Sequence, residues 1–188
     1  MISGENLFAV VLPAGGLGLR MGGQIPKQLL PLKGKPVYRH SLDTFLSLKE
    51  ISEVVLAVPQ DWKEHFENDI LNAGISTEWK NKLKIVVGGK ERWQSVRHGV
   101  ETITSNAKYV LVHDVARPFI SKELLTQIFE TLVSKGSCIV AKERADTVKV
   151  VTNGKIEKTL DRNSIWLAQT PQCASVELLK NLYQKIDK

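Results

Sequence analysis

Two cations, Arg20 and Lys27, stand beside a glycine-rich stretch and are the residues best suited to chemistry on a phosphate. The stretch spans residues 13–28 and follows the apolar run 7–12, which predicts a buried strand. Its glycines remove side chains, so backbone N–H groups can approach a ligand closely and φ > 0 is accessible. An N–H-rich loop beside two cations suits a polyphosphate. We therefore predict a phosphate-binding loop, against the alternative of a tight turn after a strand.

The glycine spacing differs from that of two common phosphate loops. A Walker loop requires Gly-Lys followed by Ser or Thr, and the chain has neither. Gly16 and Gly18 fit the first two glycines of a dinucleotide fingerprint, but Met21 occupies the third position. The pattern therefore predicts a nucleotide-phosphate site of another class.

The composition of the chain limits the classes of partner that it is expected to bind. The 188 residues, 43% of them hydrophobic, predict a single domain over residues 1–188. A net charge of +6 is compatible with nucleic-acid binding, but the cations are scattered and no aromatics lie between them, which favours small anionic substrates. We find neither an apolar run of membrane-spanning length nor a secretory signal. The sequence predicts a cytoplasmic protein that binds neither nucleic acid nor a membrane, and a basic nucleic-acid-binding module remains an alternative.

Strands and helices alternate along the chain. Strands are predicted at 7–12, 54–58, 84–87, 109–114 and 138–141, and helices at 37–48, 61–73, from about Glu91 to Ile103, after Ser121 and from about Ala174. This alternation predicts an α/β fold with a doubly wound, mainly parallel (Rossmann-like) sheet. Ligands in such sheets bind at the carboxyl ends of the strands. The glycine loop, Gly88-Gly89 and Asp114 all follow strand ends, so they are predicted to share one site.

A break in this rhythm predicts an inserted hairpin arm at about residues 146–162. Asn153-Gly154 separates two alternating runs, 147–152 and 155–160, and this is a strong hairpin signal. A two-stranded hairpin is marginally stable by itself in water. We therefore expect the arm to pack against a second copy of the chain in a homodimer. The alternative is an arm folded over its own domain.

Two segments after strands carry further candidate side chains. Asp114 could hold a ribose, a metal-bound water or a substrate hydroxyl, and Arg117 could meet a phosphate; a local ion pair that shapes the turn is the alternative. Gly89 offers bare backbone for reading a base, and Ser95 lies in the first turns of the following helix. An ordinary strand-to-helix turn would have the same pattern.

The arm and the segment after it carry the last candidates. Thr147 and Arg162 lie at the root of the arm, where a surface ion pair is the alternative. Thr170 lies in a Thr-Pro-Gln sequence that would also suit a turn. The chain has no nucleophile elbow and no His/Cys cluster at metal-ligand spacing, so hydrolysis by a catalytic triad and a structural zinc are not predicted.

Taken in order, these motifs resemble a known family over almost the whole chain. They are Pro13-Ala-Gly-Gly-x-Gly-x-Arg-Met, Pro26-Lys-Gln, Gly88-Gly-x-x-Arg-x-x-Ser-Val, Val112-His-Asp-x-Ala-Arg-Pro, Asp146-Thr-Val-Lys, Asp161-Arg-Asn and Thr170-Pro-Gln. The series resembles the 2-C-methyl-D-erythritol 4-phosphate cytidylyltransferases of the non-mevalonate isoprenoid pathway, within the sugar-phosphate nucleotidyltransferases. Ribitol-5-phosphate cytidylyltransferases share most motifs, but Asp161-Arg162-Asn163 with Trp166 is more similar to the methylerythritol enzymes.

The resemblance implies transfer of CMP from CTP to a polyol phosphate, with Mg²⁺ held mainly by the CTP phosphates and Asp114 as a possible ligand. It assigns catalysis to Arg20, Lys27 and Arg162. It assigns nucleotide binding to Pro13, Ala14, Gly15, Gly16, Leu17, Gly18, Gly89, Lys90 and Ser95. Acceptor binding falls to Asp114, Arg117, Thr147 and Thr170, and the neighbouring subunit of a homodimer would supply Thr147 and Arg162.

Two departures from the family pattern affect these expectations. Lys90 stands where relatives often have an acidic or small residue, so its contact with the base is expected to differ. The chain also stops before a Thr-bearing segment and a late Lys that grips the acceptor phosphate in the family. We therefore expect a C-terminus truncated relative to the family. Two alternatives follow: a ribitol-5-phosphate cytidylyltransferase, or a protein that binds CTP without transferring CMP.

Overall fold

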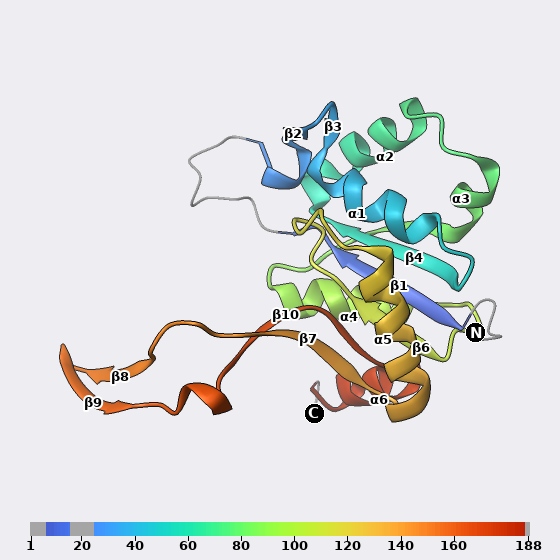
Figure 1. The fold of residues 1–188 in the computed structure, drawn as a ribbon. Coiled ribbons are helices and arrows are strands. Elements are labelled where there is room, and N and C mark those ends of the chain that lie inside the picture. The colour runs from blue at the N-terminus through green and yellow to red at the C-terminus, as the bar shows by residue number, and fades with distance from the viewer. Residues whose placement is uncertain (1–6, 16–24, 187–188) are drawn as a thin grey trace.

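A six-stranded sheet forms the centre of the computed structural model, which describes residues 7–15 and 25–186 (Figure 1). Its order is β5 (Leu83–Val87), β4 (Ile51–Val58), β1 (Phe8–Pro13), β6 (Tyr109–Val112), β10 (Trp166–Ser175) and β7 (Cys138–Glu143). Strands β5, β4, β1 and β6 pair in parallel, whereas β10 runs antiparallel to both β6 and β7. The prediction of a mainly parallel α/β sheet is confirmed.

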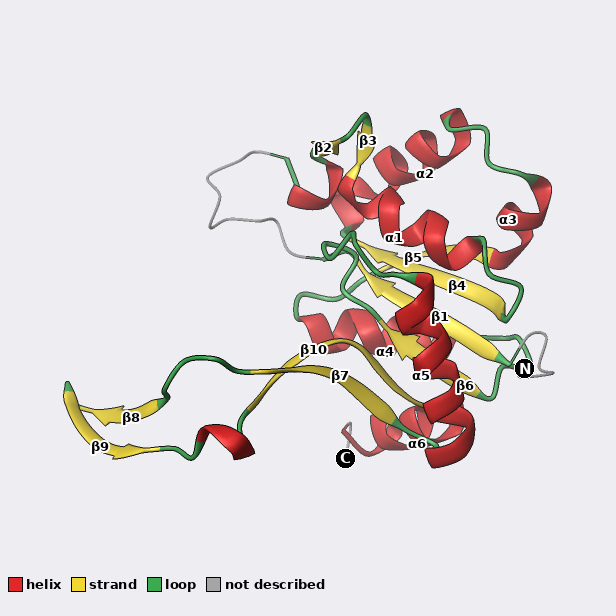
Figure 2. Ribbon diagram, in the orientation of Figure 1, coloured by secondary structure: helices red, strands yellow, loops and turns green. Residues whose placement is uncertain are grey.

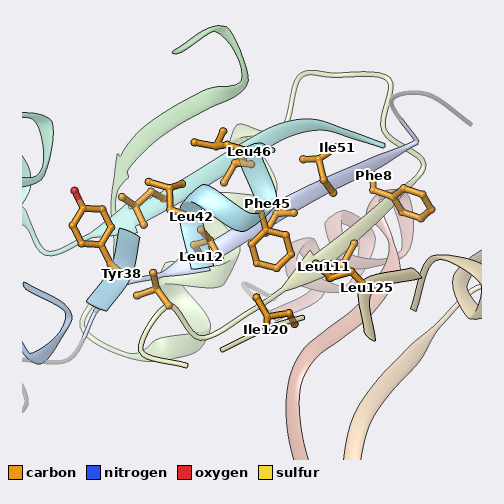
Figure 3. Packing of buried hydrophobic residues seen from close by; sticks show 14 of the residues in the cluster. Phe8, Leu12, Tyr38, Leu42, Phe45, Leu46, Ile51, Leu111, Ile120 and Leu125 are labelled. Carbon is orange, nitrogen blue, oxygen red and sulfur yellow. The ribbon is translucent and has the colours of Figure 1, made fainter. Parts of the chain in front are cut away.

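Helices cover both faces of this sheet (Figure 2). They are α1 (Val37–Leu46), α2 (Lys63–Asn72), α3 (Thr77–Lys82), α4 (Arg92–Thr102), α5 (Lys122–Lys135) and α6 (Val176–Ile186). Phe8 and Leu12 of β1 belong to the larger core, together with Phe45 of α1 and Leu125 of α5 (Figure 3). The alternate residues of β1, Ala9 and Val11, belong to the second core with α4 and α6. The buried strand thus has two apolar faces, as a doubly wound sheet requires.

Strand β10 was not predicted. Residues 166–172 contain Pro171, and proline is normally excluded from the middle of a sheet because it cannot donate to the ladder. The ladder with β7 accommodates it through a register shift between Ala168 and Gln172. Beyond the shift, Cys173 pairs with Leu111 of β6 on one side and with Cys138 of β7 on the other. Both cysteines are free thiols.

Three shorter elements also carried no sequence signal that we recognised. Helix α3 begins after Ser76, whose hydroxyl accepts a hydrogen bond from the backbone N–H of Trp79 at 3.2 Å. Strands β2 (Pro31–Leu32) and β3 (Lys35–Pro36) form a small antiparallel pair ahead of α1. None of the helices within the described part of the chain is long and apolar enough to cross a membrane.

The predicted hairpin is present and projects from the body of the protein (Figure 1). Strands β8 (Lys149–Thr152) and β9 (Lys155–Thr159) pair with each other as a two-stranded sheet, separate from the other strands of the described residues. Asn153 has φ 51° and Gly154 has φ 76°. Two positive φ values at consecutive central residues identify a type I′ turn, which explains the Asn-Gly pair. The arm continues from the ends of β7 and β10, which pair as far out as Glu143 and Trp166.

Candidate nucleotide-binding site

A cleft of about 430 Å³ lies at the carboxyl edge of the sheet, where β1, β5 and β6 end. It is lined by Pro13, Gly15, Lys27, Gln28, Gly89, Lys90, Glu91, Arg92, Ser95, Asp114, Ala116 and Arg117. The structure therefore brings Gly15, at the start of the glycine-rich stretch, together with Gly89 and Asp114. Its charged lining has four cations and two carboxylates, which favours an anionic ligand.

Gln28 ties together the two ends of the glycine-rich stretch. Its side-chain Nε2 donates to the carbonyl oxygens of Ala14 at 2.8 Å and Gly15 at 2.9 Å. The same residue lies in the short 3₁₀ helix Lys27–Leu29, and its side chain is almost fully buried. Because Lys27 is its direct neighbour, these two bonds fix where the Lys27 backbone stands relative to β1.

The loop between β5 and α4 is shaped by a close approach of the helix. A Cβ on Gly89 would lie 2.2 Å from the Cβ of Gln94, so no larger residue fits there without a shift. The buried hydroxyl of Ser95 accepts a hydrogen bond from the Gly89 N–H at 3.0 Å. The Glu91 N–H donates to the Gln94 side chain at 2.9 Å, within a reciprocal cap of α4. In this structure Ser95 thus acts on the shape of the loop.

Asp114 stands between two arginines. Its carboxylate accepts a hydrogen bond from Nε of Arg92 at 2.8 Å, and Nε of Arg117 lies 3.5 Å from its other oxygen. Both arginine side chains are about half exposed. Exposed ion pairs of this kind contribute little stability. A planar guanidinium suits phosphate oxygens, so both arginines can exchange this carboxylate for a ligand at small cost.

The other predicted site residues lie outside this cleft or outside the described residues. Thr170 is buried behind Asp114, and its hydroxyl accepts the Asp114 N–H at 3.3 Å. Thr147 and Arg162 belong to the arm, where Arg162 and Trp166 line a separate cavity of about 350 Å³. Four of the predicted site residues, Gly16, Leu17, Gly18 and Arg20, lie outside the described residues.

Sequence reasoning missed four residues of the lining: Gln28, Glu91, Arg92 and Ala116. Gln28 and Arg92 were part of the recognised motifs, so their positions carried a signal. Their roles depend on the fold, however, because Arg92 meets a carboxylate 22 positions away and Gln28 bonds back across the loop.

The side chains of the cleft could hold a metal ion only if a bound substrate supplied further oxygen ligands. Among residues 7–15 and 25–186, no group of three or more His, Cys, Asp or Glu side chains could hold a metal ion. Mg²⁺ usually takes one or two carboxylates together with substrate phosphates. Asp114 offers such a carboxylate at the cleft, whereas the Glu91 side chain caps α4. The residues fit a magnesium ion that is held mainly by a polyphosphate.

A doubly wound sheet with a cleft at its carboxyl edge, lined by four cations and two carboxylates, is typical of the class of nucleotide-binding α/β proteins. Residues 8–188 match the model of the 2-C-methyl-D-erythritol 4-phosphate cytidylyltransferase family. The chain therefore belongs to that family.

Individual relatives agree with this assignment. A protein of that name from Oryza sativa, marked chloroplastic, is 38% identical over 98% of this chain and 60% of its own length. One from Clostridioides difficile is 32% identical over 97% of this chain and 75% of its own length. The chain thus spans less than two thirds of the rice relative.

Solved structures agree as well. The 4-diphosphocytidyl-2C-methyl-D-erythritol synthase of Anaerococcus prevotii superposes with a TM-score of 0.81 at 26% identity, covering 96% of this chain and 76% of its own. The Francisella tularensis 2-C-methyl-D-erythritol 4-phosphate cytidylyltransferase has a TM-score of 0.75 at 29% identity, covering 94% and 76%. The likeness extends over nearly all of this chain.

Proposed function

We propose that the protein transfers CMP from CTP to 2-C-methyl-D-erythritol 4-phosphate, giving 4-diphosphocytidyl-2-C-methyl-D-erythritol and pyrophosphate. The observation that carries the proposal is the cleft, in which Lys27, Arg92 and Arg117 converge on one edge of the sheet. Family membership supplies the identity of both substrates. We place this activity in the cytoplasm, although the rice relative is named as chloroplastic.

The proposed reaction is a displacement at the α-phosphorus of CTP. An oxygen of the acceptor phosphate attacks, the bond to the β-phosphate oxygen breaks, and pyrophosphate leaves. No protein nucleophile is required. A phosphate monoester has a second pKa of about 6, so the acceptor is already mostly dianionic at neutral pH and needs no general base. Catalysis then rests on position and on charge stabilisation.

Residues of the site would both position the substrates and stabilise the charge of the transition state. Lys27 would neutralise the triphosphate and, with Arg20, stabilise the charge that develops on its oxygens. Bare backbone at Gly15 and Gly89 would let the nucleotide approach closely, beside Lys90 and Ser95. Asp114 and Arg117 would position the acceptor. Asp114 and the CTP phosphates would hold Mg²⁺, which would supply positive charge to offset the charge of the leaving pyrophosphate.

A pyrophosphate-release assay with CTP tests this assignment. We expect release with methylerythritol 4-phosphate and at least tenfold less with ribitol 5-phosphate at equal concentration, a difference of about 1.4 kcal/mol in transition-state binding. The reverse preference would assign the ribitol reaction instead. Saturable CTP binding without release from either acceptor would identify a nucleotide-binding protein without the transfer activity.

We further propose a homodimer formed through the arm. Val151, Ile156 and Trp166 carry large apolar side chains that are more than half exposed in the single chain. A two-stranded hairpin with an exposed apolar surface is stabilised by packing on another element. A second copy can present the same surface in return. The partner's Thr147 and Arg162 would then complete the acceptor site.

Deletion of the arm tests the dimer. Replacing residues 147–160 by a short glycine-serine linker should give a monomer in light scattering at concentrations where the intact chain is dimeric. An arm-deleted protein that stayed dimeric would rule out the arm as the main contact.

A further inference from the structure

His113 lies directly behind the cleft without lining it. It follows β6 and is 2% exposed, and its ring packs edge-on against Phe45 of α1 at a centroid distance of 5.5 Å. The next residue is Asp114, and Arg117 closes the same turn through its N–H, which donates to the Asp114 carbonyl at 2.9 Å. Both ends of this turn therefore lie within reach of one buried imidazole.

The hydrogen bonds of His113 define its protonation. Nε2 lies 3.0 Å from the carbonyl oxygen of Arg117. A carbonyl can only accept, so Nε2 must carry the proton. Nδ1 lies 3.1 Å from the hydroxyl oxygen of Thr170, which itself accepts the Asp114 N–H at 3.3 Å. The hydroxyl proton of Thr170 is then available for Nδ1.

These bonds form a chain that runs in one direction. The Asp114 N–H donates to Thr170, the Thr170 hydroxyl donates to Nδ1 of His113, and Nε2–H donates to Arg117. Every buried donor and acceptor in the series has a partner when the imidazole is neutral. Gln169 precedes Thr170 in β10, and its side-chain oxygen accepts a hydrogen bond from the Arg117 guanidinium.

We infer that His113 is a positioning residue, which as a neutral imidazole protonated at Nε2 holds Asp114 and Arg117 toward the acceptor. This inference rests on the proposed function for the identity of the acceptor. The partners of both ring nitrogens, the Arg117 carbonyl at Nε2 and the Thr170 hydroxyl at Nδ1, carry this inference. Strand β10 thereby fixes the cleft turn from behind.

Substitution of His113 separates its two hydrogen bonds. His113→Phe keeps an aromatic ring beside Phe45 and removes both bonds. We expect the KM for methylerythritol 4-phosphate to rise about tenfold, the change that corresponds to one net hydrogen bond of about 1.4 kcal/mol. The KM for CTP should stay within about twofold, because Lys27 and Gly89 are held by other contacts. His113→Gln can still donate to Arg117 and should recover part of the loss.

A surface histidine provides the matched control. His65→Phe makes the same change on the exposed side of α2 and should leave both KM values unaltered. Equal rises in the two KM values for His113→Phe would overturn the inference, as would no rise in either. If His113→Phe fails to fold, the wild-type protein still tests the inference. A His113 imidazole that carries its proton on Nδ1 instead of Nε2 would overturn the inference.

The tautomer measurement also separates this inference from the proposed function. A ¹⁵N-edited NMR spectrum of the imidazole groups reports which nitrogen of His113 is protonated without any turnover. The expected result is a neutral ring with its proton on Nε2, and Thr170→Val should shift the Nδ1 resonance. If no acceptor releases pyrophosphate while this signature is present, the proposed function fails and the hydrogen-bonded turn stands.

Discussion

The cleft and the arm are held in place in opposite ways. The cleft loops are fixed by polar side chains that are almost fully buried, with Gln28 at 1%, Ser95 at 1% and His113 at 2% exposure. In the arm, Val151 and Ile156 are 54% and 66% exposed. Within the described part of the chain, the strands of the arm pair only with each other. One region is thus positioned by buried contacts within its own chain, whereas the other forms no sheet pairing with the rest of the described residues.

This difference predicts two kinds of sensitivity. A change in the cleft should alter binding or turnover at every protein concentration, because the contacts that fix it are intramolecular. A change in the arm should act through association and so depend on concentration. The following variants test that division.

The largest effect is expected for Lys27→Ala. Loss of one preorganised charge that stabilises the transition state commonly lowers kcat by about 10²–10³-fold. Pyrophosphate release measures this directly, and the melting temperature should not move because Lys27 is exposed. Lys49→Ala, another exposed lysine after α1, is the matched control and should be fully active. Unchanged turnover in Lys27→Ala would remove this residue from catalysis.

Gln28→Leu should affect both stability and nucleotide binding. The substitution keeps the size of the side chain but removes the donors to the Ala14 and Gly15 carbonyls. A buried acceptor that loses its partner costs about 1–3 kcal/mol, so urea unfolding should show a loss of this size together with weaker CTP binding. Gln127→Leu on the exposed face of α5 should change stability by less than about 0.5 kcal/mol. A Gln28 variant that bound CTP normally would show that these bonds do not position the loop.

Glu53→Gln should change stability without changing activity. The Glu53 carboxylate, on β4, accepts from the Ser105 N–H at 2.8 Å and pairs with Lys84 at 2.7 Å. Burial raises its pKa, but Lys84 and the N–H groups of Ser105 and Thr104 outweigh burial and leave the pKa below 4.5. At pH 7 the variant should be less stable by about 1–3 kcal/mol.

The sign of the pH dependence follows from that lowered pKa. The ordinary pKa of this carboxyl is 4.5, and the folded chain lowers it. As the pH falls below that value, the unfolded chain takes up a proton at Glu53 before the folded chain does, so the stability of the fold decreases. The difference between wild type and Glu53→Gln should therefore shrink as the pH drops below about 4.5 in chemical denaturation. Glu130→Gln, exposed on α5, is the control. A difference that stayed constant with pH would contradict the role of this carboxylate.

The smallest change in intrinsic stability is expected for Ile156→Asp. The side chain is two-thirds exposed, so unfolding of the single chain should change by less than about 0.5 kcal/mol. The dimer of this variant should be weaker, because a carboxylate would be buried between two apolar surfaces. Light scattering should therefore show monomer at protein concentrations where the wild type is dimeric. Glu157→Gln on the opposite face of β9 should leave association unchanged. A monomeric wild type would refute the predicted arm interface.

Local patterns explain why parts of the fold were predictable. The alternation of apolar runs and amphipathic segments predicted the parallel strands, and Asn153-Gly154 predicted the turn of the arm. Each of these signals consists of residues that are close together in the sequence. Strand β10 has no such local signal. Its pairing between β6 and β7 depends on partners such as Leu111 and Cys138, which lie far away in the sequence.

For the candidate site, the sequence by itself determined which groups stand at strand ends: the bare glycines, Lys27, and the Asp114–Arg117 segment. The tertiary structure alone decided how they are held. Gln28 closes the glycine loop, Arg92 reaches Asp114, and His113 meets Thr170 across 57 positions of the chain. A residue type and its spacing can specify a local backbone shape, but a buried hydrogen bond between distant segments exists only once the sheet has brought them together.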